Sequence, residues 1–75
     1  MKCLIIGDAR FFGSLVAEEL LAYNCQVAIL DQNPLPEKLK HDVQQIYGHV
    51  DELASKRGEI ENFEPNATIH LGAKN

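Results

Sequence analysis

The sequence of 75 residues predicts an α/β protein, half of a doubly wound fold with a parallel sheet and helices on both faces. Short apolar runs that end at a glycine or a polar residue alternate along the chain with segments of helical periodicity. Strands and helices that alternate in this way pair in parallel through right-handed crossovers. No repeat or linker interrupts the alternation, so we expect residues 1–75 to form a single domain.

The first strand is expected at Lys2–Ile6, a continuous apolar run that is too short for a helix and should be covered on both faces. A helix is expected over residues 11–23, with Asn24 as its C-terminal cap. Large apolar side chains recur there at three- and four-residue spacing, and glutamates take the other side. This spacing predicts that the core face of the helix consists of Phe12, Leu15, Val16, Leu20 and Tyr23.

The second strand is expected at Gln26–Asp31, a β-branched and aliphatic run that ends in a polar residue. Two prolines follow closely, so the chain should turn there, and residues 37–42 have room for only a turn or two of helix. Val43–Tyr47 alternates between apolar and polar residues and stops at Gly48, which predicts a short strand at the edge of the sheet.

The last two elements are a helix over residues 51–63, with a weak point at Gly58, and a strand over residues 67–71. A proline and an asparagine separate them. The final run is apolar and is followed by Gly72, which predicts a strand buried on both faces.

The charge balance is 7 basic against 11 acidic residues, a net charge of −4 and a pI near 5.2. This balance argues against a nucleic acid or an anionic membrane as a partner. No stretch approaches the roughly 18 apolar residues of a membrane span, and the N-terminus lacks the pattern of a signal peptide. A cytoplasmic location is therefore the expectation.

The cysteines and histidines do not predict a metal site. Cys3 and Cys25 lie in strand-like apolar runs and are interpreted as buried thiols. His41, His49 and His70 fall in separate segments without the spacing of metal ligands.

Residues 7–13 lie between the first strand and the first helix, where doubly wound folds place a pyrophosphate on the helix N-terminus. Gly7 would permit the tight turn there, and Gly13 would allow close packing of the helix. Asp31 ends the second strand eighteen residues after Gly13, where a carboxylate could accept hydrogen bonds from a ribose diol. No arginine follows it, which favours NAD over NADP. The alternative is that both glycines serve the turn alone and that Asp31 is a solvated carboxylate.

Four stretches of the chain resemble one family in the right order. The run LIIGDARFFGSLVAEELL, followed by QVAILD, resembles a strand, the motif G-G-x-G-F-I-G-S, a helix and a strand that ends in Asp. Residues 47–51 (YGHVD) resemble G-D-[IL]-x-D, and residues 68–73 (TIHLGA) resemble V-I-H-L-A-A. The chain therefore resembles the N-terminal half of the NAD-dependent epimerase/dehydratases, which belong to the extended short-chain dehydrogenase/reductases.

This resemblance implies a truncated Rossmann domain with strand order 3-2-1-4 and NAD as the cofactor. The residues that the resemblance assigns to the cofactor are Gly7, Arg10, Phe11, Phe12, Gly13, Asp31, Gln32, His49, Val50, Leu71, Gly72 and Ala73.

The chain departs from the family pattern at three of the positions near the cofactor. Arg10 replaces the middle glycine, so its side chain either points out of the site or pairs with phosphate. Asp8 replaces a small residue, and it either adds a negative charge to the turn or caps the helix. His49 stands where the family carries an Asp that contacts the adenine.

Catalysis by this chain alone is not expected. The family uses a Tyr-x-x-x-Lys pair, whereas the fourth residue after Tyr23 is Val27 and the fourth after Tyr47 is Asp51. We therefore expect a module that binds NAD or another nucleotide. The alternatives are an interaction protein with a decayed cofactor site and a chain whose partner supplies the catalytic half. An exposed apolar edge at residues 67–71, with His70 at the interface, predicts a homodimer.

Overall fold

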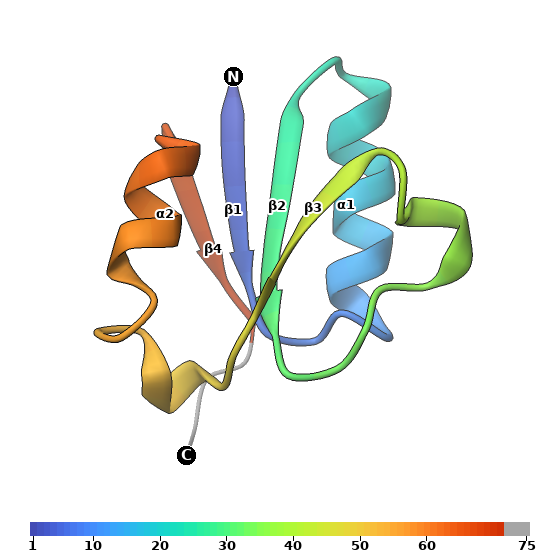
Figure 1. Ribbon diagram of the computed structural model, residues 1–75. Coiled ribbons are helices and arrows are strands. Elements are labelled where there is room, and N and C mark those ends of the chain that lie inside the picture. The colour runs from blue at the N-terminus through green and yellow to red at the C-terminus, as the bar shows by residue number, and fades with distance from the viewer. Residues whose placement is uncertain (72–75) are drawn as a thin grey trace.

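The computed structural model describes residues 1–71, which form one sheet of four parallel strands in the order β3-β2-β1-β4. Figure 1 shows the helical segments on both sides of this sheet, so the expected fold class is confirmed. No helix in residues 1–71 is long and apolar enough to cross a membrane. The elements are β1 (Lys2–Ile6), α1 (Phe12–Ala22), β2 (Gln26–Asp31), the 3₁₀ turn η1 (Glu37–Leu39), β3 (Val43–Tyr47), the 3₁₀ turn η2 (Val50–Glu52), α2 (Arg57–Phe63) and β4 (Ala67–His70).

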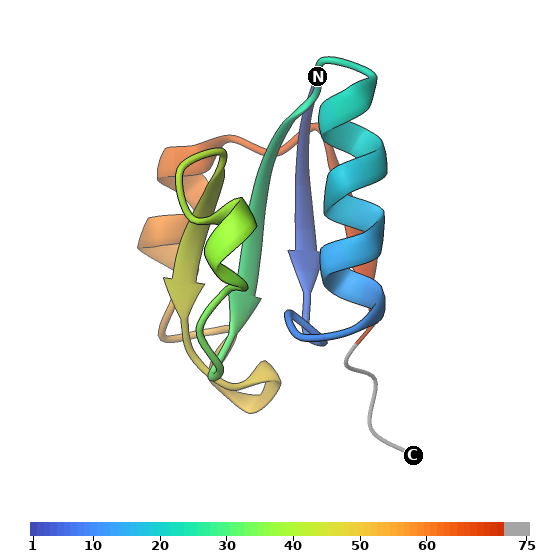
Figure 2. The same ribbon diagram turned by 90° about the vertical axis from the view of Figure 1, so that its right-hand side faces the viewer.

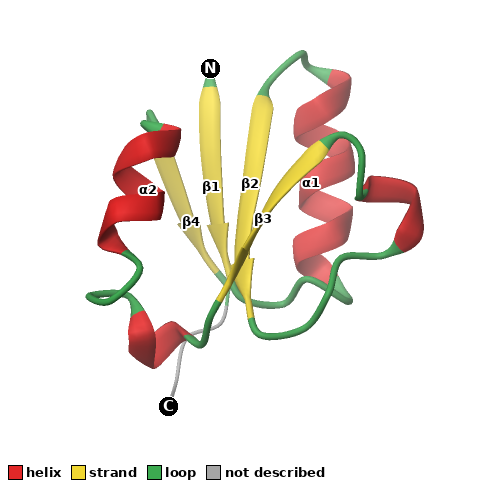
Figure 3. Ribbon diagram, in the orientation of Figure 1, coloured by secondary structure: helices red, strands yellow, loops and turns green. Residues whose placement is uncertain are grey.

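β1 lies inside the sheet and pairs in parallel with β2 on one side and β4 on the other. Ile5 is the partner of Ile29 in β2 and of Ile69 in β4. Because the strands are parallel, their carboxyl ends meet at one edge of the sheet, where Figure 3 shows the loops that follow β1, β2 and β3.

The core has two layers, one on each face of the sheet. α1 and η1 cover the face that carries Ile5, Ile29 and Val43, and α2 covers the face that carries Leu4 and Ile46. The turned view in Figure 2 separates α1 from α2 across the sheet. The continuous apolar runs of β1 and β2 are therefore buried on both faces, as their sequences predict.

The core face of α1 differs from the expected one. The residues of α1 that are fully buried are small, namely Gly13, Ser14 and Ala17, and they bring the helix close to the sheet. The expectation that Phe12, Leu15 and Tyr23 are core residues was wrong, because they are 67%, 59% and 74% exposed. Once the small residues face the sheet, the spacing of 100° per residue turns these larger side chains outward. The remaining members of the expected face, partly buried and packed on the core, are Val16 and Leu20.

α1 ends at Ala22 with Tyr23 as its C-cap, one residue earlier than expected, and Asn24 follows in the left-handed conformation. Its φ is 65°, and its N–H donates to the carbonyl oxygen of Leu21 at 2.9 Å. Asparagine tolerates this conformation better than most residues, so Asn24 carries little strain.

A single helix over residues 51–63 does not form. The chain instead makes η2, a turn, and then α2, and Gly58 lies inside α2 rather than at the interruption. η2 is closed by its own cap, in which Glu52 Oε1 accepts the N–H of His49 at 2.7 Å. The Glu52 carbonyl oxygen accepts the Ser55 hydroxyl at 2.8 Å as well as the N–H groups of Ser55 and Lys56, so the turn between η2 and α2 is closed locally.

β4 is less buried than its apolar sequence predicts. The strand ends at His70, and both Thr68 and His70 are exposed, while Ala67 and Ile69 are half-buried. The expectation of burial on both faces was wrong. β4 lies at the sheet edge beside β1 only, and α2 packs over the inner strands, so one face of β4 stays open.

The two cysteines are neighbours, which their separation in the sequence does not indicate. Cys3 is buried in β1, and Cys25, just before β2, is half-buried. Burial raises the pKa of the Cys3 thiol, and the adjacent Cys25 thiol raises it further. The thiolate of Cys3 is therefore disfavoured in the folded protein.

We expect iodoacetamide to modify Cys25 more than about tenfold faster than Cys3 in the native protein. The reagent alkylates only thiolates that it can reach, and Cys3 is buried. Mass spectrometry of peptides after timed labelling at mildly alkaline pH measures both rates. In urea the two rates should converge. Equal rates in the native protein would contradict the buried state of Cys3, and a Cys3→Ala variant controls for the assignment.

Candidate functional site

A cavity of about 310 Å³ opens at the carboxyl edge of the sheet. It lies where the β1–α1 turn, the end of β2 and the residue after β4 come together. This is the place where open α/β sheets bind their ligands. The described residues that line it are Asp8, Arg10, Phe11, Asp31, Asn33 and Leu71.

Two glycines shape the β1–α1 turn beside the cavity. Gly7 has a φ of 89°, which side chains disfavour, and its N–H donates to the carbonyl oxygen of Leu30 at 2.7 Å. At Gly13 a Cβ atom would lie 2.3 Å from the carbonyl oxygen of Asp8. α1 can therefore approach the turn this closely only because position 13 has no side chain. Both observations agree with the roles expected from the sequence.

Asp8 caps the start of α1, which is one of the two roles that its position suggests. Its Oδ2 accepts the N–H of Phe12 at 3.1 Å, and its carbonyl oxygen accepts the N–H of Gly13 at 2.8 Å and that of Phe11 at 3.3 Å. The φ of Asp8 is 60°, a left-handed conformation that Asp adopts more readily than most residues. The first N–H groups of the helix thus have acceptors within the turn itself.

Asp31 joins the end of β2 to the same turn. Its Oδ2 accepts the N–H of Ala9 at 2.7 Å, and its Oδ1 accepts the N–H of Gln32 at 2.7 Å. An ionised carboxylate offers about four acceptor positions, so two of them remain for a ligand. The half-buried Asp31 carboxylate is therefore both a structural link and an acceptor that lines the cavity.

Gln45 holds the loop after Asp31, a role that sequence reasoning missed. Its Nε2 donates to the carbonyl oxygen of Asn33 at 3.0 Å, and its Oε1 accepts the N–H of Leu35 at 2.8 Å. Gln45 thereby positions Asn33, which lines the cavity. The available signal was a long amide side chain inside a short strand, next to a loop that contains two prolines.

Arg10 and Phe11 line the cavity from the turn and also border a second cavity of about 410 Å³. Phe12 and Leu15 line this second cavity but not the first. Arg10 is exposed, and no ion pair of its guanidinium occurs within residues 1–71. The start of α1 therefore carries an unpaired positive charge among exposed apolar side chains.

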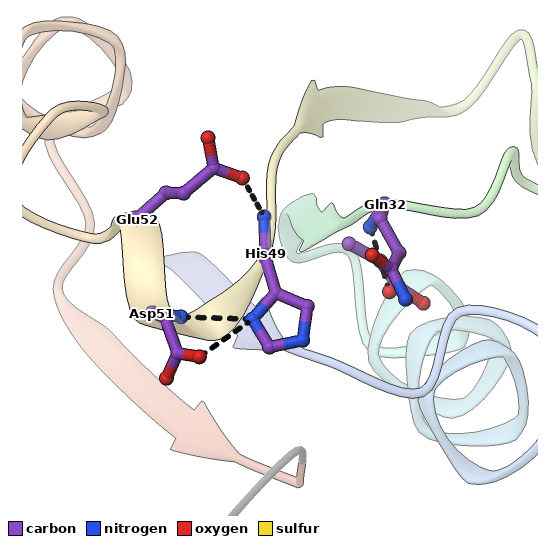
Figure 4. Close-up of polar contacts among 5 residues, drawn as sticks. Gln32, His49, Asp51 and Glu52 are labelled. Carbon is purple, nitrogen blue, oxygen red and sulfur yellow. Dashed lines mark hydrogen bonds and ion pairs between the residues drawn. The ribbon is translucent and has the colours of Figure 1, made fainter.

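His49 caps η2 instead of lining the cavity. Figure 4 shows its ring beside η2, where Nδ1 accepts the N–H of Asp51 at 3.1 Å. The Asp51 carboxylate lies 3.3 Å from the same nitrogen. Val50 begins η2. The exposed Gln32 follows Asp31, and its N–H donates to the Asp31 carboxylate.

Four of the residues that the resemblance assigns to the cofactor, from three segments of the chain, are brought together around one cavity. Gly72 and Ala73 lie outside the described residues. Within residues 1–71 no group of three or more His, Cys, Asp or Glu side chains could hold a metal ion. The four that line the cavity are Arg10, Phe11, Asp31 and Leu71.

A solved structure has the same fold as this chain. The structure of the Bordetella bronchiseptica enzyme WbmH in complex with NAD⁺ matches this chain with a TM-score of 0.76 and 23% sequence identity. The fold is half of a Rossmann domain. The match covers 99% of this chain and 26% of the WbmH chain, so this chain spans about a quarter of the length of that enzyme. No protein-family model and no curated protein matches the sequence.

We expect Gly13→Ala to destabilise the protein by more than about 2 kcal/mol, because its methyl group would overlap the Asp8 carbonyl group and force α1 away. Gly58→Ala is the matched control, since a Cβ at that position of α2 meets nothing within 4 Å. It should stabilise the fold by about 0.5–1 kcal/mol. Urea unfolding followed by circular dichroism measures both changes. A Gly13→Ala variant as stable as Gly58→Ala would contradict the close packing of α1.

Proposed function

We propose that this chain is a Rossmann-type module that binds a nucleotide, NAD included, in the cavity at the carboxyl edge of the sheet. The observation that carries this proposal is the Asp31 carboxylate, which lines the cavity beside the β1–α1 turn. A carboxylate at the end of the second strand accepts hydrogen bonds from the two hydroxyl groups of a ribose. The NAD⁺ bound to WbmH supports the choice of ligand.

The proposed module binds its ligand without transforming it. The described site has one carboxylate from β2 and one from the turn, and both accept hydrogen bonds from backbone N–H groups. The Tyr-x-x-x-Lys pair is absent from the sequence. In the alternative that a partner chain supplies the catalytic half, that chain would carry this pair, and its co-purification is the test.

We expect millimolar NAD or another nucleotide to raise the melting temperature, since a ligand at 100 times its dissociation constant stabilises the folded state by about 2.7 kcal/mol. Thermal unfolding with NAD, NADP, ATP and a UDP-sugar makes this measurement. No shift with any of the four would overturn the proposal.

The Asp31→Ala variant should weaken nucleotide binding by about tenfold or more, because a hydrogen bond to a charged group contributes about 1.5–3 kcal/mol. Asp42→Ala is the matched control, since it removes an exposed carboxylate just before β3, at the opposite edge of the sheet. It should leave binding unchanged. Equal losses in both variants, measured by calorimetric titration, would indicate an effect of net charge instead of a contact at Asp31.

A second proposal, self-association through β4, is favoured by the position of that strand at the edge of the sheet. The outer side of β4 presents backbone groups that can pair with another strand. Thr68 and His70 are exposed there, and Ile69 and Leu71 are only half-buried. A second copy of the chain related by a two-fold axis would extend the sheet and cover these residues.

We expect a molecular mass of twice 8.4 kDa at micromolar concentration by sedimentation equilibrium. Thr68→Lys should shift the protein toward the monomer, because equal charges would face each other across the two-fold axis. Gln44→Lys is the matched control, an exposed position on β3 at the other edge of the sheet. A monomeric wild-type protein, or dissociation by Gln44→Lys alone, would rule out β4 as the interface.

A further inference from the structure

Asp8 occupies the donors that a pyrophosphate would need. Its carboxylate accepts the N–H of Phe12, and its carbonyl oxygen accepts those of Phe11 and Gly13. A pyrophosphate on a helix N-terminus is held by such N–H groups and by the positive end of the helix dipole. In this chain an aspartate oxygen already takes the place of a phosphate oxygen at Phe12.

The charge of Asp8 opposes a second anion at the same position. Asp8 lines the cavity itself, so a diphosphate seated on α1 would lie against its carboxylate. Displacing the carboxylate would also break its exposed hydrogen bond to the N–H of Phe12, at a cost of about 0.5–1.5 kcal/mol. The first turn of α1 is therefore a poor place for the linkage that joins the two halves of a dinucleotide.

The other groups of the cavity remain suited to a smaller nucleotide. Asp31 keeps acceptor positions for a ribose diol, as described above. Arg10 lines the same cavity, and no ion pair of its side chain occurs in the described chain. A guanidinium binds a terminal phosphate through two parallel hydrogen bonds. The volume of about 310 Å³ is at the lower end of the range for ligand pockets, about 300–1,000 Å³.

We propose that this cavity selects a ribonucleoside monophosphate over a pyrophosphate-linked dinucleotide, with the ribose on Asp31 and the phosphate on Arg10. The inference rests on the proposed function, since it names the ligand class of the same cavity. It differs from a dinucleotide site in one physical respect. The phosphate is held by a side chain at the rim of the cavity, because the Asp8 carboxylate occupies the N–H of Phe12 and the Asp8 carbonyl oxygen occupies those of Phe11 and Gly13.

The direct test is titration of the wild-type protein with AMP, NAD and adenosine, followed by heteronuclear NMR. We expect AMP to bind more tightly than NAD, and adenosine to bind about tenfold more weakly than AMP because it lacks the phosphate. NAD binding as tightly as AMP or more tightly would overturn the inference and leave the proposed function intact. Failure of all three ligands to bind would overturn the proposed function itself.

The Asp8→Gly variant tests whether the Asp8 carboxylate is the group that disfavours the dinucleotide. Glycine accepts the φ of 60° at this position, so the turn can keep its shape while the Phe12 N–H becomes free. We expect NAD affinity to rise about tenfold and AMP affinity to stay within about twofold. Asp8→Asn is the matched control, because its amide oxygen still caps α1 while the charge is lost. It should raise NAD affinity less than Asp8→Gly, and equal gains would overturn the occupied-donor explanation.

Arg10→Gln tests the phosphate contact. We expect this variant to lower AMP affinity about tenfold and to leave adenosine affinity unchanged. A loss of the same size for both ligands would overturn the assignment of the phosphate to Arg10.

Discussion

The parallel pairing of β1 with a strand on each side is the constraint on which the rest of the structure depends. Each parallel neighbour requires the chain to cross back over a face of the sheet. The move from β1 through β2 to β3 places α1 and η1 on one face, and the return to β4 places α2 on the other. All four described strands then end at the same edge, where the β1–α1 turn meets the end of β2.

Two carboxylates hold that edge together, and they also determine which chemistry is left for a ligand. Asp31 links β2 to the turn through the N–H of Ala9, and Asp8 links the turn to α1 through the N–H of Phe12. Each bond consumes a backbone donor that lies near the cavity. Besides Asp8, the polar residues that line the cavity within residues 1–71 are Asp31, which keeps acceptor positions, Arg10 and Asn33.

The same close packing that anchors α1 also exposes apolar surface. Gly13 and Ala17 face the sheet because they are small, and α1 lies near the strands for that reason. The larger Phe12 and Leu15 are then turned away from the core, near the second cavity. The start of α1 and the outer side of β4 are therefore both left uncovered in this fold. Within residues 1–71, the core is centred on β1 and β2, and the outer elements are only partly covered.

The sequence by itself determined the order of the elements, the bounds of β1, β2 and β3, and the special backbone at Gly7. These features depend on apolar periodicity and on local sterics, which neighbouring residues decide. Only the tertiary structure decided that α1 buries its small residues and that Thr68 and His70 stay exposed. It also decided that Gln45 reaches Asn33. Burial and long-range hydrogen bonds depend on which group lies opposite in space, and spacing along a chain does not contain that information.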